Sequence, residues 1–259
     1  MLIGGKERDI SIPNPALRKI QKRILKEVLN SIRVSADCYS QRGRSSIHAA
    51  RRHVRHDVLI HHDIKSFFPS TSRSRVLEAL ARSRVAEAAA RAIVDLSMLD
   101  GLPEGASTSS ALGNIVLTRL DARLGSWSQQ HGITYTRYVD DLAFSGGDRL
   151  KSHAKFLRRV IEDEGWSLSS KGGVLDSSMR KQYLGVRVNS TPSPDEMLMD
   201  DARLAGRRIL SRPDAFPDHY VRRVEARMRY IEQVTDESLT SRQALTDLLR
   251  QRNRLLPSD

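Results

Sequence analysis

The chain has 259 residues, 39% of them hydrophobic, which is enough to bury a core in one domain or in two tightly joined lobes. Its 43 Lys and Arg outnumber its 31 Asp and Glu, and the net charge of +12 indicates a polyanionic partner, because basic side chains that neutralise phosphates release condensed counterions. The single cysteine, Cys38, excludes an internal disulfide and a multi-cysteine zinc site, and with neither a membrane-length apolar run nor a signal peptide we expect a cytoplasmic protein without a membrane partner.

In the first part of the chain, the spacing of apolar residues predicts a helix, a strand and a second, broken helix. Residues 14–34 repeat apolar side chains at helical intervals, with Lys and Arg on the opposite side. Residues 58–64 form a short apolar run typical of a buried strand, which ends before Pro69. Residues 73–99 are rich in Ala and Leu and predict a helix broken once, before Gly101 interrupts the pattern.

The second part continues with alternating helices and strands. Residues 108–130 again have helical spacing, and residues 133–145 are typical of a hairpin. Residues 149–164 predict another helix, and residues 183–189 a last strand. The Thr-Pro-Ser-Pro sequence at 191–194 resembles a boundary between lobes, and the chain beyond it is mainly helical and rich in arginine.

Two adjacent carboxylates, Asp140 and Asp141, interrupt the apolar run of the predicted hairpin. Asp is common in hairpin turns, so a turn alone would explain the pair. Asp63 at the end of the predicted strand adds a third carboxylate. Nucleotidyl transfer by two metals needs carboxylates from separate strands to converge on ions about 4 Å apart. Because neighbouring side chains on a strand point to opposite faces, we expect Asp140 to be the principal ligand and Asp141 to assist from the turn.

Four motifs, in chain order, resemble those of bacterial reverse transcriptases. Residues 63–70 (Asp-Ile-Lys-Ser-Phe-Phe-Pro-Ser) are similar to the first catalytic motif, and residues 138–141 (Tyr-Val-Asp-Asp) to the Tyr-X-Asp-Asp box. Between them, residues 101–110 (Gly-Leu-Pro-Glu-Gly-Ala-Ser-Thr-Ser-Ser) resemble the Leu-Pro-Gln-Gly-Ala-Pro-Thr-Ser-Pro loop of the family. Residues 6–13, with the helix behind them, resemble its fingers motif. The likeness covers residues 6–190.

Two further segments resemble elements of retron reverse transcriptases. Residues 49–53 (Ala-Ala-Arg-Arg-His) are similar to the Asn-Ala-X-X-His element of retrons, with Ala49 in place of Asn. Of the retron Val-Thr-Gly motif, residues 183–185 (Tyr-Leu-Gly) keep the glycine. We therefore expect a retron-type enzyme. Other bacterial reverse transcriptases stay open (abortive-infection, diversity-generating or group II intron types), as does a catalytically weak RNA-binding scaffold.

The resemblance implies an α+β right-hand polymerase fold. Fingers and palm, the palm an antiparallel sheet backed by helices, would span residues 1–190, and a helical thumb residues 191–259. It also implies DNA synthesis on an RNA template from deoxynucleoside triphosphates, with two Mg²⁺ ions. The residues implied at the metals are Asp63, Ile64, Asp140 and Asp141.

A retron enzyme would also have particular partners and a particular product. The resemblance implies that the template is a structured non-coding RNA encoded beside the gene. Synthesis would start from a 2′-OH of a guanosine in that RNA and leave a branched RNA–DNA hybrid, the msDNA. An effector protein would make the system a device for antiphage defence.

Several residues are expected around the nucleotide. By resemblance, Arg8 and Lys6 would meet the triphosphate, which a guanidinium can bind in a bidentate manner, and Phe68 would exclude a ribose 2′-OH. Glu104 stands where the family has Gln, and a carboxylate beside a triphosphate is electrostatically unfavourable. Gly105 would let the backbone approach the substrate closely.

Further basic residues have two readings each. Lys171 stands where the family has a lysine near the leaving pyrophosphate, a candidate general acid, and the alternative is a loop lysine. The arginines of the helical tail would bind the template–primer duplex through its phosphates, and the alternative is a basic surface that serves solubility. These arginines are Arg203, Arg207, Arg208, Arg222 and Arg223.

The histidines near the predicted strand do not suggest a metal site. His61 and His62 are adjacent on a strand and should face opposite sides, so they cannot chelate one ion together. His53 and His56 have helical spacing but no third ligand in register. We expect them to be structural or to face RNA.

Overall fold

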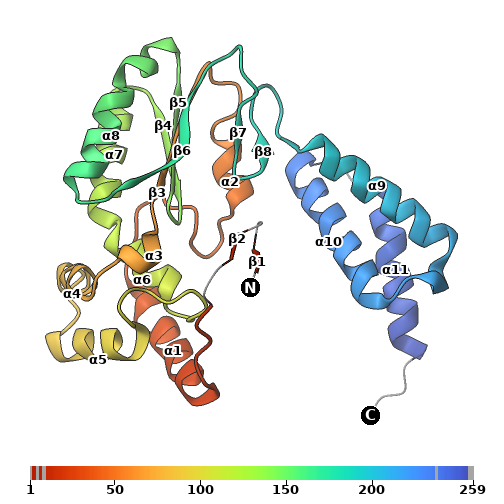
Figure 1. Cartoon of the computed structure of the whole chain (residues 1–259), viewed down its shortest axis with the longest axis horizontal. Helices are drawn as coiled ribbons and strands as arrows, with labels where there is room; N and C mark the ends of the chain where they lie inside the picture. Colours follow the sequence, from red (N-terminus) through yellow and green to blue (C-terminus); the bar gives the residue numbers. More distant parts are fainter. Residues whose placement is uncertain (1, 4–5, 8–9, 237–238, 256–259) are drawn as a thin grey trace.

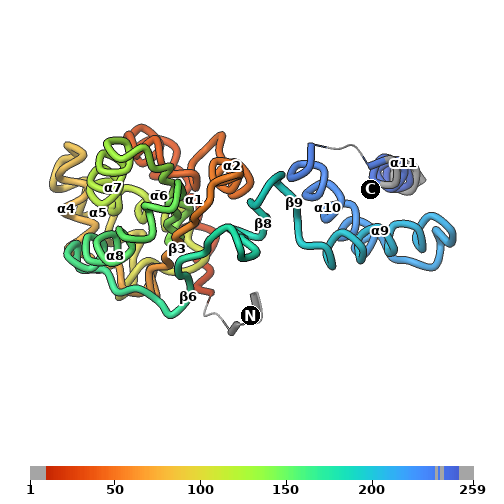
Figure 2. The backbone as a smooth tube through the Cα atoms, turned by 90° about the horizontal axis from the view of Figure 1, so that it is seen from above, coloured from red at the N-terminus to blue at the C-terminus, as the bar shows by residue number. Residues whose placement is uncertain are grey.

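The largest sheet of the protein is antiparallel and has four strands. The structure is a computed structural model, and it describes residues 2–3, 6–7, 10–236 and 239–255. The strand order is β4-β5-β3-β6. The strands are β3 (Val58–Ile64), β4 (Thr134–Tyr138), β5 (Asp141–Gly146) and β6 (Leu168–Leu175). Helices cover the sheet, and a body of three helices stands beside it (Figure 1, Figure 2). The expected α+β class, with an antiparallel sheet backed by helices, is confirmed.

Alternate residues of β3 enter two different cores, since successive side chains of a strand point to opposite faces. Val58, Ile60 and Ile64 belong to the larger core, whereas Leu59 packs in a smaller core with Tyr183. The larger core is covered by α4 (Arg73–Arg82), α5 (Glu87–Ser97), α6 (Ser109–Val116), α7 (Thr118–Gln130) and α8 (Ala154–Asp163). The smaller core is covered by α2 (Ser46–Arg51) and by a small sheet described below.

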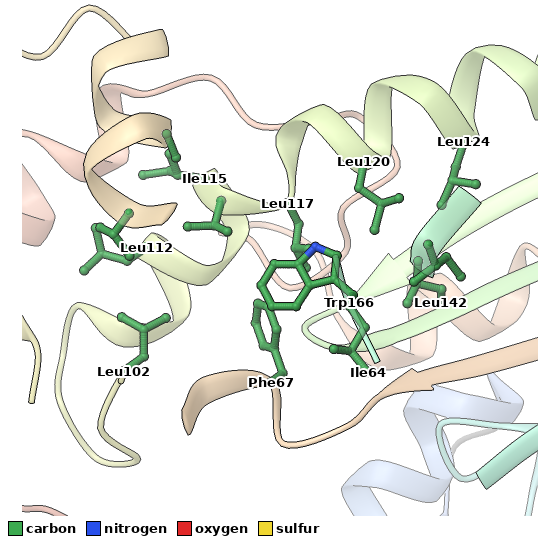
Figure 3. Packing of buried hydrophobic residues seen from close by; sticks show 14 of the residues in the cluster. Ile64, Phe67, Leu102, Leu112, Ile115, Leu117, Leu120, Leu124, Leu142 and Trp166 are labelled. Atoms are coloured by element: carbon green, nitrogen blue, oxygen red, sulfur yellow. The ribbon is translucent and has the colours of Figure 1, made fainter. Parts of the chain in front are cut away.

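The end of β3 leads directly into the larger core. Short helix α3 (Phe67–Ser70) follows β3, and the ring of Phe67 lies 5.3 Å from that of Trp166, centroid to centroid. Figure 3 shows the two rings together beneath the junction of α6 and α7, beside Ile64. Trp166 is 4% exposed and is thus part of the larger core.

Most predicted helices are confirmed, with shorter bounds. α1 (Pro15–Glu27) is capped by Asn14, whose side chain accepts from Leu17 N, and a 3-10 turn, η1 (Leu29–Ser31), follows it. The helix expected over 73–99 is broken once, between α4 and α5. The helix expected over 149–164 begins as a 3-10 segment, η2 (Asp148–His153), before α8.

One strand prediction is wrong, and one strand of the central sheet was not predicted. Residues 183–189 are not one strand but part of a hairpin, β7 (Gln182–Tyr183) and β8 (Val186–Arg187), whose turn residues Leu184 and Gly185 both have positive φ. β9 (Ser193–Pro194) completes this small sheet. β6 was not predicted at all, because its polar and glycine-rich sequence lacks apolar alternation. A further two-stranded sheet joins β1 (Leu2–Ile3) and β2 (Lys6–Glu7).

The C-terminal helices form a body with its own core. They are α9 (Glu196–Ser211), α10 (Asp218–Thr235) and α11 (Thr240–Leu255), with a 3-10 turn η3 (Pro213–Ala215) between the first two. Ile209, Met228 and Leu245 meet in their centre, whereas Val234 at the end of α10 packs into the smaller core of the sheet. Across the described ranges, no helix combines the length and apolar character needed to span a bilayer.

Candidate active site

Three carboxylates converge at one end of the sheet. Asp63, Asp140 and Asp141 each offer an oxygen, and these oxygens all lie within 4.8 Å of one another. Asp63 on β3 is paired in register with Asp141 on β5, and Ile64 N donates to the main-chain oxygen of Asp140 at 3.1 Å. All three carboxylates are half-buried, so they remain accessible to a ligand.

The positions of the two adjacent carboxylates differ from the prediction. Val139 and Asp140 form the turn between β4 and β5, and Asp141 is the first residue of β5. We expected Asp141 in the turn, which is wrong because the bend occurs one residue earlier, at Val139, whose φ is +58°. With Asp140 in the turn, its side chain is released from strand alternation and can approach that of Asp141.

Asp63 lies at an irregularity in the pairing of β3 with β6. His62 pairs with Gly172 and Ile64 with Leu168, so residues 169–171 of β6 lie opposite the single residue Asp63. Such bulges redirect side chains and are frequent next to active sites. Lys171 is therefore part of a strand rather than a loop, and its side chain is exposed.

His61 contacts the site, which the sequence interpretation missed. Its Nε2 lies 2.7 Å from Oδ1 of Asp141. The signal was present, because His61 and Asp63 are two residues apart on a strand and share a face. His62 faces the opposite side, as expected, and burial is the main reason why its pKa is lowered to about 4.

Two buried side chains support this end of the sheet. Tyr183, 1% exposed, donates from its hydroxyl to the main-chain oxygen of Asp141 at 3.2 Å. The ring of His53 lies between Oγ of Ser145 at 2.8 Å and Oγ1 of Thr136 at 2.7 Å, and thus joins β5 to β4. Burial lowers the pKa of His53 to about 3, so its ring is neutral. The structural interpretation of His53 is confirmed, because it is 1% exposed.

The residues predicted around the nucleotide are only partly described. Arg8 lies outside the described residues, and of Lys6 only the backbone is described. Phe67 points into the core and Phe68 is partly exposed, so the second ring of the pair is the accessible one. The roles of these residues stay predictions.

The loop that carries Glu104 is fixed by its backbone. The main-chain oxygen of Glu104 accepts from Ser11 N at 2.8 Å. Gly105 has a φ of +112°, and a Cβ on it would lie 2.9 Å from Cγ2 of Ile10, so close approach of the two segments needs glycine here.

The arginines predicted to bind nucleic acid lie away from the carboxylates, on the three-helix body. All five are exposed. They are Arg203, Arg207 and Arg208 on α9, and Arg222 and Arg223 on α10.

Comparisons with known proteins agree with these features. The family described as reverse transcriptase (RNA-dependent DNA polymerase) matches residues 4–188. The retron Mx65 reverse transcriptase of Myxococcus xanthus is 33% identical over 210 residues, which are 72% of this chain and 49% of the relative. The retron Ec86 reverse transcriptase of Escherichia coli is 28% identical over 168 residues, 63% of this chain and 52% of the relative. The chain thus spans about half the length of the curated relatives it matches.

Solved structures show the same fold at low identity. Apo telomerase from Candida tropicalis has a TM-score of 0.54 and 10% identity, and the match covers 93% of this chain and 49% of that one. Telomerase from Candida albicans in complex with a fragment of telomeric RNA has a TM-score of 0.52 and 10% identity, with 91% and 53% covered. Together with the sheet and its helices, this likeness confirms the expected right-hand polymerase fold.

Proposed function

The chain belongs to the reverse transcriptase (RNA-dependent DNA polymerase) family, and on this basis we propose that it is an RNA-directed DNA polymerase of the retron type. The observation that carries the proposal is the convergence of Asp63, Asp140 and Asp141 from two strands and a turn. Carboxylate oxygens at this spacing fit a hard divalent cation, and Mg²⁺ is the ion that takes carboxylate and phosphate oxygens together.

The metals would be held by this chain's own oxygen atoms. Asp63, Asp140 and Asp141 would bind through their carboxylates, and Ile64 through its main-chain oxygen, because its side chain is buried. When bound, two such ions activate an attacking hydroxyl and stabilise the leaving pyrophosphate. Lys171, on the strand opposite Asp63, would supply the proton to the leaving group.

The nucleotide would lie between the carboxylates and the loop of Glu104. The partly exposed ring of Phe68 would exclude a ribose 2′-OH and so favour deoxynucleotides. Gly105 would allow the backbone to approach the substrate, and Arg8 and Lys6 would meet the triphosphate. Glu104 would add a negative charge where the family has a neutral side chain.

The nucleic acid would extend from the carboxylates toward the C-terminal helices. In this proposal residues 1–190 are fingers and palm and residues 191–259 the thumb. The exposed arginines of α9 and α10 would bind the phosphates of the template–primer duplex, which carry no sequence information but fix its position.

The names of the relatives support a more specific version. Both curated relatives described above are retron reverse transcriptases. We infer that the template is a structured RNA encoded beside the gene, that priming uses a 2′-OH of that RNA to give a branched RNA–DNA hybrid, and that an effector protein completes an antiphage system.

Analysis of the nucleic acid that purifies with the protein tests this function. The protein is expressed from its native locus, purified, and its bound nucleic acid is treated with RNase and with DNase. We expect a branched RNA–DNA species that disappears in the double variant Asp140→Asn and Asp141→Asn. The matched control is Asp200→Asn with Asp201→Asn, which removes the same two charges from an exposed adjacent pair on α9 and should keep the product.

The other outcomes point to the alternatives. RNA alone, unchanged in the double variant, would contradict polymerase activity and favour an RNA-binding scaffold. DNA without a templated sequence would contradict the retron type and favour an enzyme of the abortive-infection type.

A further inference from the structure

The turn that carries Asp140 has an unfavourable backbone. Val139 has a φ of +58°, in the left-handed region. Positive φ is an outlier for a β-branched residue, and such a conformation persists only where the surrounding structure imposes it. The contacts of Val139 should therefore show what holds the turn in place.

The main-chain N–H and the main-chain oxygen of Val139 both form hydrogen bonds with side chains. Its N–H donates to Oγ of Ser40 at 3.0 Å, and its main-chain oxygen accepts from Nη1 of Arg137 at 2.8 Å. These two bonds fix the orientation of the residue directly before Asp140. Ser40 is distant in sequence from the hairpin, so this support comes from the tertiary fold.

A third residue joins the two supports to each other. Asn114 on α6 is 5% exposed, and its Oδ1 accepts from Oγ of Ser40 at 2.9 Å and from Nη1 of Arg137 at 3.0 Å. Its Nδ2 donates back to the main-chain oxygen of Ser40 at 2.9 Å. Ser40, Asn114, Arg137 and Val139 thus form one connected network.

The far end of the network is anchored in the core. Arg137 donates to both carboxylate oxygens of Asp121, at 2.8 and 2.7 Å, and both side chains are fully buried. The hydroxyl of Tyr135 donates to the same carboxylate at 2.9 Å. A bidentate pair of this kind has a fixed geometry, so Nη1 of Arg137 is held in one direction.

The segment before Ser40 is held along the hairpin as well. Arg137 N donates to the main-chain oxygen of Asp37 at 2.8 Å, and Tyr39 N donates to that of Arg137 at 2.7 Å. Ser40 is the next residue after this paired segment, so its hydroxyl is placed beside the turn at Val139.

We propose that Ser40 is a positioning residue of the carboxylate site, which holds the backbone of Val139 so that Asp140 and Asp141 converge with Asp63 on divalent cations. The inference rests on the proposed metal-binding function. Without the hydroxyl, the N–H of Val139 loses this acceptor and the turn can leave its left-handed conformation. The carboxylates then separate, and the affinity for a divalent cation falls.

Direct binding of Mn²⁺ to the purified 259-residue chain tests the role of Ser40, with the free ion measured by electron paramagnetic resonance in the absence of nucleotide. We expect Ser40→Ala to raise the dissociation constant of Mn²⁺ about tenfold, the lower end of what residues that orient metal ligands contribute. Ser40→Thr keeps the hydroxyl and should restore binding to within about twofold of the unmodified chain, well short of that loss. A merely structural serine would not show this rescue.

Three further variants make the result decisive. Ser83→Ala removes another partly buried, hydrogen-bonded hydroxyl, at the C-cap of α4, and should leave binding unchanged. Asp140→Asn should weaken binding strongly, because it removes a ligand. If Ser40→Ala fails to fold, Ser40→Cys takes its place, because it keeps the size of the side chain but offers only a weak acceptor. We expect it to raise the dissociation constant of Mn²⁺ as Ser40→Ala would.

The outcomes separate the two proposals. Unchanged binding in Ser40→Ala together with loss in Asp140→Asn would overturn the role of Ser40 and leave the metal site intact. Unchanged binding in Asp140→Asn would overturn the metal site, and the role of Ser40 with it. Equal loss in Ser40→Ala and Ser40→Thr would show that the hydroxyl is not the cause, and would also overturn the inference.

Discussion

The guanidinium of Arg51 on α2 donates from Nη2 to the main-chain oxygen of Gln233 near the end of α10, at 2.7 Å. The same atom lies 3.3 Å from the main-chain oxygen of Val234 and 2.7 Å from Oδ1 of Asp236. The last carbonyls of a helix have no partner within it, and Arg51 supplies one from outside. It therefore ties the three-helix body to the smaller core of the sheet, into which Val234 also packs.

Replacement of Arg51 should loosen this connection. Arg51→Ala removes charge-assisted hydrogen bonds to two carbonyls, and we expect the free energy of unfolding to fall by about 1–3 kcal/mol. Hydrogen exchange should accelerate at the end of α10, while amides of β3 and β5 keep their protection. Arg227→Ala, an exposed arginine on the same helix, is the control and should change neither. Equal acceleration across the whole chain would contradict a local tie.

The neutral ring of His53 makes stability depend on pH. Its pKa is about 3 in the folded chain, mainly because burial penalises the charge, and about 6.5 in an unfolded one. The unfolded state therefore takes up the proton first as the pH falls. The stability that this difference contributes is fully present above pH ~6.5 and is lost as the pH falls from ~6.5 toward ~3, by up to about 1.4 kcal/mol per pH unit.

Urea unfolding between pH 7.5 and pH 5, in the unmodified chain and in His53→Gln, measures this contribution. The variant loses the hydrogen bonds to Ser145 and Thr136 in part, so it should be less stable at pH 7.5. Its stability should nevertheless fall less steeply toward pH 5. His62 titrates in both proteins, so the difference between their slopes belongs to His53. Parallel curves would contradict a buried neutral ring.

The elements that the sequence predicted well are those with strong local patterns. The apolar run of β3 and the hairpin of β4 and β5 needed no tertiary information, and all three strands are found where expected. β6 was missed because residues 169–173 are Ser, Lys and Gly, which have low strand propensity. The strand exists because the edge of β3 offers it hydrogen-bonding partners.

The residues that hold the candidate site in place were harder to predict from the sequence. Arginine is rarely fully buried, so nothing in the sequence indicated that Arg137 lies in the core against Asp121. The contact of Ser40 with the turn depends on a pairing between residues far apart in the chain. By contrast, the contact of His61 with Asp141 could have been expected from strand alternation.

Two glycines with positive φ allow two effects of a Gly→Ala change on stability to be separated: the strain of the left-handed backbone and the steric overlap of the new Cβ. A Cβ on Gly172, where φ is +100°, would overlap the main-chain oxygen of His61. Gly43, where φ is +80°, has no atom within 4 Å of such a Cβ. Both Ala variants carry the left-handed strain, about 1–2 kcal/mol. Gly172→Ala should lose about 1–3 kcal/mol more, because β6 must move away from β3.

Urea unfolding of the two glycine variants measures how much free energy of unfolding each variant loses. The loss in Gly43→Ala gives the backbone strain, and the additional loss in Gly172→Ala gives the steric overlap. Gly172→Ala should also reduce DNA synthesis, since the displaced strand includes Lys171 and lies opposite Asp63. Gly43→Ala should keep its activity. Equal losses of stability in both variants would mean that β6 accommodates the methyl group without moving.

The carboxylate of Glu104 should weaken nucleotide binding. The main-chain oxygen of Glu104 accepts from Ser11 N, and Glu104→Gln keeps this bond while it removes the charge of the side chain. Removal of a like charge near the triphosphate should relieve a repulsion on the order of 1 kcal/mol, which corresponds to about a fivefold lower KM for the nucleotide. The value of kcat should change little, because the repulsion acts equally on bound substrate and transition state.

Steady-state kinetics at two salt concentrations tests the position of this charge. The decrease in KM should be larger at low ionic strength, since salt screens the charge of this partly exposed carboxylate. Glu27→Gln, an exposed glutamate on α1 with 56% of its side chain accessible, should have no effect at either concentration. An unchanged KM in Glu104→Gln at low salt would place the carboxylate away from the triphosphate. A lower kcat with an unchanged KM would instead assign Glu104 a part in the reaction itself.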